Sequence, residues 1–430
     1  MGNPLTDTRL QALAKFYTQH LRHTMLPFWL ERAPDREQGG FFTCFTPDGV
    51  QLASTDKFTW SQGRVAWLFS RMATSPAQIF SDAERAEFLS IARSAANFLL
   101  KHCIRPDGCY FVTTRDGSPK EHAPGLGLCP STFADVFVVL GLAYYAAASR
   151  DSRLLDKAID LFYQIEQKAA DQSFRTAPYI VDPGMRLAIV PMYILNLTNE
   201  LRRACKLLGD SRAGLFDSFA VKYGSMILDK FRQPGNLVLE QLGADLNPAD
   251  SFLGRYTNPG HSVEIGWFIL EGCISRGDKT NADRAVSIIK RAVDSGGDSE
   301  FGGIFYYVDV DGMQPRGRVV TEADASARPQ YDRDWSNKLW WPHTEALYAL
   351  LLAYWHTGDD WLLERFLQLH DYTFKTFPNP DESIGEWIQL RDRQGRPLHD
   401  DVGGRLPVKD PYHANRNLLM LIELLSPQAE

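Results

Sequence analysis

Residues 131–149 read STFADVFVVLGLAYYAAAS, and this stretch decides how the chain is interpreted. Its apolar residues recur at helical spacing. They cover almost the whole circumference of the helix that this spacing predicts, and such a helix is buried on every side. We therefore expect 131–149 to be a helix that other helices enclose.

Helical periodicity extends along the rest of the chain in segments that fall into pairs. The predicted helices cover residues 8–30, 60–74, 84–102, 131–149, 152–170, 187–209, 212–232, 260–276, 281–294, 338–357, 359–377 and 412–425. Second helices such as 131–149 are apolar nearly all round. The pairing predicts a repeated helical hairpin with an outer first helix and an inner second helix.

A second kind of segment recurs between the two helices of a pair. Residues 40–49 (GFFTCFTPDG), 108–117 (GCYFVTTRDG) and 303–312 (GIFYYVDVDG) are β-prone, aromatic and end in Asp-Gly. This pattern is typical of a β-hairpin. Weaker relatives lie at 236–248 and 386–395, and the poorly patterned stretch 171–186 occupies the remaining position.

A unit of roughly 65–80 residues that recurs six times indicates one repeat architecture rather than several domains. We predict a single all-α domain over residues 1–430, an (α/α)6 barrel with short β-hairpins at one end. An open superhelical solenoid fits the same repeat and stays an alternative. The polar stretch 313–337 is the longest interruption, and we expect it to form a lid loop over one end of the barrel.

Composition excludes several classes of protein. The net charge is −7 and the chain has no basic stripe, so nucleic acid is not an expected partner. We find no N-terminal signal and no uninterrupted apolar run long enough to span a bilayer. The six cysteines are scattered without zinc spacing, which fits reduced thiols and a cytoplasmic location.

The starts of the second helices collect the polar outliers. All hairpins lie at one barrel end, so these helix starts face the same end. They carry Arg64, His261 with Glu264, Trp341 with His343 and Glu345, and His413 with Arg416, while Asn196 lies farther along its helix.

His261 and Glu264 are three residues apart and so share a helix face, where the carboxylate would support the histidine. A lone histidine at a helix start is more often a neutral structural group, and Glu264 and Glu345 also fit as acids of a first helical turn. Zinc or manganese is an alternative use of these side chains, although HExxH is absent and no acidic cluster appears. We expect no metal.

These blocks resemble the N-acylglucosamine 2-epimerase family, which includes the renin-binding proteins. The likeness covers nearly the whole chain and is carried by GGFFTCFTPDG with TDKFTWSQGRVAW, NPGHSVEIGWFIL, KLWWPHTEALYALL, GEW and a late YHANR. The family has the (α/α)6 barrel. The resemblance implies a 2-epimerase of free sugars, with N-acetylglucosamine and N-acetylmannosamine as the leading substrates, and a homodimer. It implies no required cofactor, although ATP activates some members.

Carried over by position, His261 and His413 match the acid and base, and Glu264 and Glu345 match the carboxylates that support them. Arg64 matches the sugar-binding arginine, and Glu386 and Trp387 fall in the EW block. Trp341 and Trp387 fit either sugar stacking or barrel packing.

Two departures from the family pattern stand out. The late block reads YHANR where the family commonly has FHxPR. Asn196 stands where sugar isomerases and disaccharide epimerases of the superfamily often carry a histidine, which favours the acylglucosamine branch.

Epimerisation at C2 breaks a C–H bond next to a carbonyl and returns a proton to the opposite face. Two histidines suit this task because their pKa lies near neutrality. An aldose–ketose isomerase uses the same enediol and is the nearest alternative. A glycosidase with two carboxylates and a purely binding role are the others.

Overall fold

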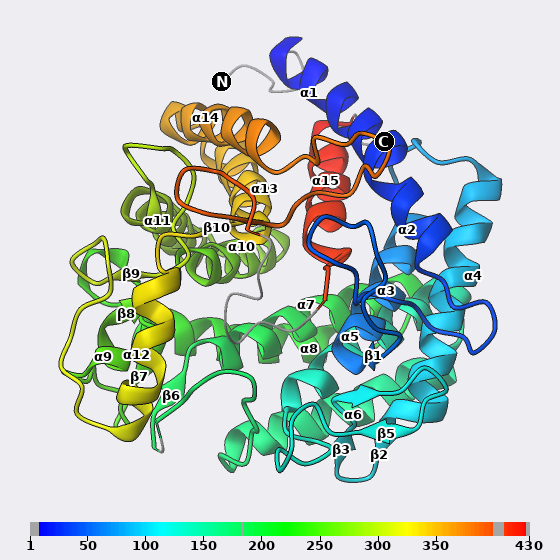
Figure 1. Cartoon of the computed structure of the whole chain (residues 1–430), viewed down its shortest axis with the longest axis horizontal. Coiled ribbons are helices and arrows are strands. Elements are labelled where there is room, and N and C mark those ends of the chain that lie inside the picture. The colour runs from blue at the N-terminus through cyan, green and yellow to red at the C-terminus, as the bar shows by residue number, and fades with distance from the viewer. Residues whose placement is uncertain (1–7, 183, 399–407, 427–430) are drawn as a thin grey trace.

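The computed structural model describes residues 8–182, 184–398 and 408–426. Within them, long helices form two concentric layers, as Figure 1 shows. The inner helices are α3 (Thr59–Ala73), α5 (Thr132–Ser149), α7 (Ile189–Leu208), α10 (Pro259–Arg276), α13 (Trp340–Thr357) and α15 (Tyr412–Leu425). The outer layer comprises α1 (Thr8–Gln19) continued by η2 (His20–Met25) and α2 (Leu26–Arg32), α4 (Asp82–Phe98) with η3 (Leu99–Cys103), α6 (Ser152–Ala170), α8 (Ala213–Met226) with η4 (Ile227–Phe231), α11 (Lys279–Gly296) and α14 (Asp360–Thr376).

The inner helices form a closed ring. Each contacts the next in the order α3, α5, α7, α10, α13 and α15, and α15 returns to contact α3. The outer helices α4, α6, α8, α11 and α14 pack on the inner helices that precede or follow them in the chain, whereas α1 packs on α15 and so joins the two ends of the described chain. All twelve predicted helices are present, and ring closure confirms the (α/α)6 barrel over the open solenoid.

Helix α5 shows why the opening stretch of sequence is so apolar. Its buried residues run almost without a break from Thr132 to Ala147. Among the described helices it alone is long and apolar enough to cross a membrane, and 89% of it is buried inside the protein. Neighbouring helices enclose α5, and this accounts for its high hydropathy. The expectation that no segment is long and apolar enough to span a bilayer is therefore wrong for α5, judged by length and composition alone.

Short strands join neighbouring units at one end of the barrel. They are β1 (Lys57–Phe58), β2 (Ile104–Arg105), β3 (Gly108–Cys109), β4 (Val112–Thr113), β5 (Pro119–Lys120), β6 (Arg186–Leu187), β7 (Gln241–Leu242), β8 (Tyr256–Thr257), β9 (Val308–Asp309), β10 (Lys338–Leu339) and β11 (Leu390–Arg391). The strand before an inner helix pairs with the loop of the next unit, as β1–β4, β6–β7, β8–β9 and β10–β11. At α5 a single bridge, Ser131 to Thr176, takes the place of such a pair.

The last of these junctions closes the ring. The backbone N–H of Lys409, which precedes α15, donates to the carbonyl of Thr43 in the first unit at 2.7 Å. The predicted self-contained hairpins are therefore corrected in part: among the described strands β2–β3 and β4–β5 pair within one loop, and isolated bridges such as Phe45 to Leu52 and Gly297 to Ile304 do the same. Neighbouring units lie side by side in a ring, so their strands satisfy each other's backbone groups across the unit boundary.

The stretch 313–337 is not a plain loop. It contains α12 (Glu322–Asp334), which a capping box between Thr321 and Asp324 initiates. Helix α12 packs against the short helix α9 (Phe252–Arg255), and a one-turn helix η5 (Pro234–Asn236) lies earlier in the chain. Figure 1 shows α12 at the edge of the ring beside β7, β8 and β9. Whether this segment opens and closes as a lid stays a prediction.

Two inner helices approach closely through glycine. A Cβ atom on Gly63 would lie 2.1 Å from the carbonyl oxygen of Phe137, and one on Gly141 would lie 2.6 Å from the carbonyl oxygen of Gly63. Both distances are far below van der Waals contact. Helices α3 and α5 can therefore hold this spacing only with glycine at both positions.

We expect Gly63→Ala to lower the free energy of unfolding by about 1–3 kcal/mol or more, because α3 and α5 must move apart. Urea denaturation measures the change. Gly224→Ala on outer helix α8 is the matched control, since no neighbouring atom lies within 4 Å of its added Cβ. It should leave the protein as stable or stabilise it by up to about 1 kcal/mol. Equal stability of Gly63→Ala and wild type would contradict the packing argument.

Candidate active site

The barrel end that carries the strand junctions contains a cavity of about 470 Å³. This volume is in the range of small-molecule sites. The described lining comes from the inner-helix starts and from the loops between outer and inner helices. Of the predicted residues, Arg64, His261, Glu264, Trp341 and His413 contribute to it.

His261 is placed by the start of α10. The Asn258 side chain accepts a hydrogen bond from the backbone N–H of His261 at 3.2 Å, and Pro259 occupies the first helical turn. The Asn-Pro-Gly sequence is therefore a helix cap that fixes the position of the histidine. The ring is almost completely buried and lines the cavity.

The carboxylate that holds His261 is Glu240, not Glu264. His261 Nδ1 donates to Glu240 Oε2 at 2.9 Å, which leaves Nε2 for a bound molecule. Burial lowers the pKa of His261, but Glu240, through its charge and this hydrogen bond, and Glu264, through its charge, outweigh burial and raise it above its usual value. The predicted His261–Glu264 contact is corrected, because Glu264 turns toward Arg416.

His413 is placed by the start of α15 and by two side chains. Its backbone N–H donates to Asp410 Oδ2 at 3.1 Å. Its Nδ1 donates to Glu345 Oε1 at 2.7 Å, as the predicted role of Glu345 requires. Nε2 accepts from Arg64 Nη2 at 3.2 Å. The Nε2 atom of His413 is therefore the nitrogen available to the cavity, and in this structure it accepts a hydrogen bond from Arg64.

A buried cluster supports His413 from beneath. Arg416 donates to Glu345 and, at 3.3 Å, to Glu264. Trp267 and Asn417 donate to Glu345 as well, at 3.0 and 2.6 Å. Burial raises the pKa of Glu345, but the Arg416 charge and the His413 contact more than offset it, so Glu345 is ionised. Burial and the charge of Glu345 raise the pKa of Glu264.

Glu264, Glu345 and His413 also satisfy the geometry of a metal cluster, with ligand atoms within 4.8 Å of one another. The Arg416 guanidinium already donates to both carboxylates of this group. Its positive charge lies where a metal ion would place positive charge. Its N–H groups donate hydrogen bonds to the carboxylate oxygens that would otherwise be available to coordinate a metal ion. The donor set fits an arginine better than a metal ion.

Arg64 is held by charge and by aromatic rings. Its Nη1 lies 3.4 Å from Asp410 Oδ1, and its guanidinium lies 4.3 Å from the ring centre of Phe137 and 4.8 Å from that of Trp60. Because it reaches the cavity beside His413, it can donate to an oxygen on which negative charge develops.

Trp341 lies against both histidines. Its ring centre is 5.2 Å from that of His261 and 5.7 Å from that of His413. Because this ring is part of the cavity lining, it is placed to contact a sugar bound between the histidines.

Besides Glu345, which supports His413 from beneath, four predicted site residues are not among the described residues that line the cavity. His343 donates from Nδ1 to the Leu339 carbonyl at 2.6 Å and accepts the Ile304 N–H on Nε2 at 2.9 Å. Burial lowers its pKa to about 3. Both ring nitrogens are used, so His343 fixes the loop before β9 instead of reaching the substrate. Asn196 lies buried about two turns into α7.

The EW block is buried behind the cavity wall. Glu386 accepts from Trp29 Nε1 at 2.6 Å and from Gln389 at 3.0 Å, and burial raises its pKa to about 7 despite the opposing charge of Lys409. Trp387 donates to His20 Nε2 at 2.8 Å. Of the two roles expected for Trp387, packing inside the barrel fits this geometry, and sugar stacking does not. Glu386 contacts the cavity indirectly, because Gln389, which donates to it, is part of the cavity lining.

Sequence reasoning missed Glu240 and Asp410 and gave Arg416 no role. Glu240 is the lone charge in the apolar run LVLEQL at 237–242, which is a weak signal for a buried partner. Asp410 stands three residues before His413, the spacing of a helix-capping acid.

A closed helical barrel whose cavity holds two carboxylate-paired histidines and an arginine defines a class of acid–base enzymes acting on small polar substrates. A model of the N-acylglucosamine 2-epimerase (GlcNAc 2-epimerase) family matches residues 40–416. The chain belongs to this family, and the expected isomerase class is confirmed.

Relatives agree with this assignment. The N-acylglucosamine 2-epimerases of Bos taurus and Homo sapiens are 34% and 32% identical to the chain. The matches cover 94% and 93% of the chain and 89% and 87% of those proteins. A solved sugar epimerase from a ruminal bacterium has a TM-score of 0.76 at 20% identity, with 95% of this chain and 98% of that chain covered, and shows the same fold.

We predict that Glu240→Gln moves the limb of the pH–rate profile that belongs to His261 to lower pH. Glu240 raises the pKa of His261 through its charge and its hydrogen bond, so a neutral glutamine lowers it. The other limb should stay in place. Profiles of kcat/KM in both reaction directions measure this, with Glu166→Gln on outer helix α6 as control. An unmoved pair of limbs would contradict the role of Glu240.

Proposed function

We propose that this protein interconverts N-acetylglucosamine and N-acetylmannosamine by moving a proton at C2. The observation that carries the proposal is the pair of histidines in one cavity, each fixed through Nδ1 by its own carboxylate. The relatives named N-acylglucosamine 2-epimerase support the choice of substrate.

The chemistry follows from the arrangement. With the open-chain sugar between the rings, one histidine takes the C2 proton and the other returns a proton to the opposite face. Each such transfer typically contributes about 10²–10⁴-fold. Negative charge develops on O1 of the enediolate, and Arg64 donates a hydrogen bond to that oxygen. The Arg64 N–H that contacts His413 Nε2 gives up this contact when it turns to O1. A donor of this kind is worth roughly 3–4 kcal/mol.

Among the alternatives, an aldose–ketose isomerase differs only in returning the proton to C1. A glycosidase needs two carboxylates that flank the scissile bond. Here Glu240 and Glu345 are tied to histidines, and Glu264 and Asp410 are tied to arginines. This pairing disfavours a glycosidase, and the two carboxylate-held histidines in one cavity disfavour a purely binding role.

The family resemblance also supports a homodimer, a cytoplasmic location and ATP as an activator. None of these is needed for the proton transfer itself. We keep them as predictions, and we propose that the chemistry needs no metal or redox cofactor.

His261→Asn and His413→Asn should each lower epimerisation by about 10²–10⁴-fold, because each removes one of the two proton-transfer groups. Proton NMR in D₂O, started separately from N-acetylglucosamine and N-acetylmannosamine, measures epimerisation and C2 deuterium exchange together. In each variant the remaining histidine reaches only one face of C2. C2 deuterium exchange without epimerisation should therefore persist with only one of the two epimers, and the two variants should differ in which epimer this is.

His356→Asn is the matched control, since His356 lies in the last turn of α13, away from the cavity. It should leave both rates unchanged. Full epimerisation in either active-site variant would refute the assignment, and appearance of a ketose would favour the isomerase.

A further inference from the structure

A wall of tyrosines forms one side of the cavity. We call Tyr179, Tyr256, Tyr306, Tyr307 and Tyr331 the tyrosine wall; all of them line the cavity. Three of them belong to a small hydrophobic cluster, with Phe252, Leu253 and Ala327, that is separate from the main core among the described residues.

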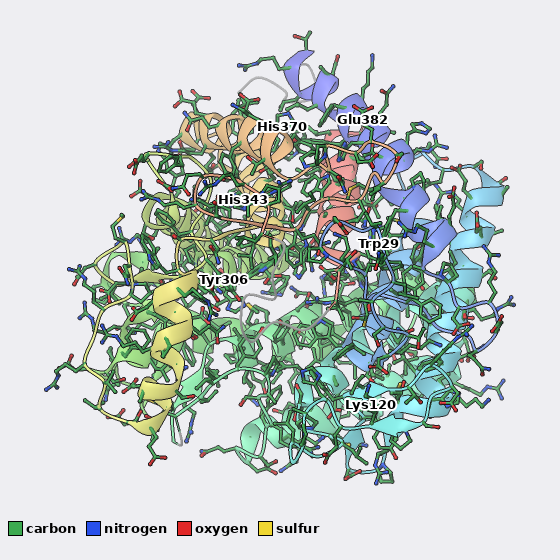
Figure 2. All side chains as sticks on the ribbon, in the orientation of Figure 1. Trp29, Lys120, Tyr306, His343, His370 and Glu382 are labelled. Atoms are coloured by element: carbon green, nitrogen blue, oxygen red, sulfur yellow. The ribbon has the colours of Figure 1, made fainter. Side chains whose placement is uncertain are left out.

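The wall is built by units far apart in the chain. Tyr331 comes from α12, Tyr256 from β8 and Tyr306 and Tyr307 from the loop before β9. Figure 2 shows Tyr306 on the side of α12 that faces the middle of the ring. The 313–337 segment therefore contributes a cavity wall, whether or not it moves.

The wall offers aromatic ring surface to a ligand. The Tyr307 and Tyr331 rings stack at 4.3 Å, and Tyr256 meets Tyr331 edge-on at 4.7 Å. Ring surface of this kind favours contact with the apolar atoms of a ligand.

The opposite side of the cavity is charged. Arg64 and Asp410 stand beside His413, and Lys409 lines the cavity next to them. Tyr179, by contrast, stands beside His261, with ring centres 6.2 Å apart. The two histidines thus lie between the tyrosine wall and the Arg64–Asp410 pair, and the Glu240 carboxylate also lines the cavity beside His261.

We propose that the tyrosine wall is the subsite for the acyl chain of an N-acyl sugar. The inference rests on the proposed function. The acylamino group is bonded to the reacting carbon, so it must lie against the immediate neighbours of the histidines. An acyl chain beside Arg64 and Asp410 would strip water from charges, whereas beside the tyrosines it buries apolar surface. The sugar hydroxyls then face the charged side.

This assignment predicts tolerance of longer acyl chains. N-propanoyl- and N-butanoylglucosamine should be epimerised by the wild-type protein. Each methylene that enters the wall should lower KM by up to roughly fourfold, until the wall is filled.

Two bulky substitutions separate the sides of the cavity. Gln330→Trp adds a ring beside the wall from α12, and Ala53→Trp adds the same ring on the opposite side, in the loop of the first unit. We measure kcat/KM for the N-acetyl, N-propanoyl and N-butanoyl substrates in each variant. Gln330→Trp should lower the butanoyl-to-acetyl ratio at least tenfold, and Ala53→Trp should leave this ratio unchanged whatever it does to the absolute rates.

Tyr306→Ala gives a second test, because the added methylenes lose a ring against which they are buried, so the butanoyl-to-acetyl ratio should fall. Thermal melting of each variant checks the fold. An equal ratio in all variants overturns the acyl subsite while the proposed function stands. Absence of turnover of N-acetylglucosamine by the wild-type protein overturns the proposed function itself, and the acyl subsite with it.

Discussion

One guanidinium ties three inner helices together beneath the cavity. Arg416 of α15 donates to Glu264 of α10 and to Glu345 of α13, and it is enclosed by the rings of Tyr412 and Trp267. Removing one partner of such a buried pair typically costs about 3–5 kcal/mol, because a charge is left uncompensated. Glu345 in turn fixes His413, so the position of one histidine depends on this single cation.

The two histidines are supported in different ways. The carboxylate of His413 belongs to an inner helix and also accepts from Arg416, Trp267 and Asn417. The carboxylate of His261 comes from a loop and has an oxygen without a described partner. A carboxylate with fewer donors holds more of its charge for its histidine. This difference provides a physical basis for unequal proton affinity in two groups that perform complementary steps.

The barrel could be predicted from sequence because its signals are local. Period and apolar face locate each helix, and the sixfold repeat orders them. The cap of His261 is equally local, since Asn258 is three residues away. Glu240 could not be predicted, because it lies 21 residues before His261 in an irregular loop, and no helical period indicates how that loop folds back onto the start of α10. For Glu264, sequence spacing indicated an available face, but a cation on α15 determined its partner. His343 is a histidine in the first turn of an inner helix, as a catalytic residue would be. Both of its ring nitrogens are nevertheless hydrogen-bonded to backbone groups, the Leu339 carbonyl and the Ile304 N–H.

Each unit forms a strand pair or a backbone hydrogen bond with the next unit. The last of these bonds joins Lys409 to Thr43 in the first unit. The second histidine follows that last junction, and its arginine comes from the second helix of the chain's first hairpin. During synthesis, the early units can form helices and pack on one another while the cavity still lacks one proton-transfer group. Catalytic competence therefore arrives in a single late event, when the last helix enters between α13 and α3. The two histidines therefore share one cavity only once the last helix is in place.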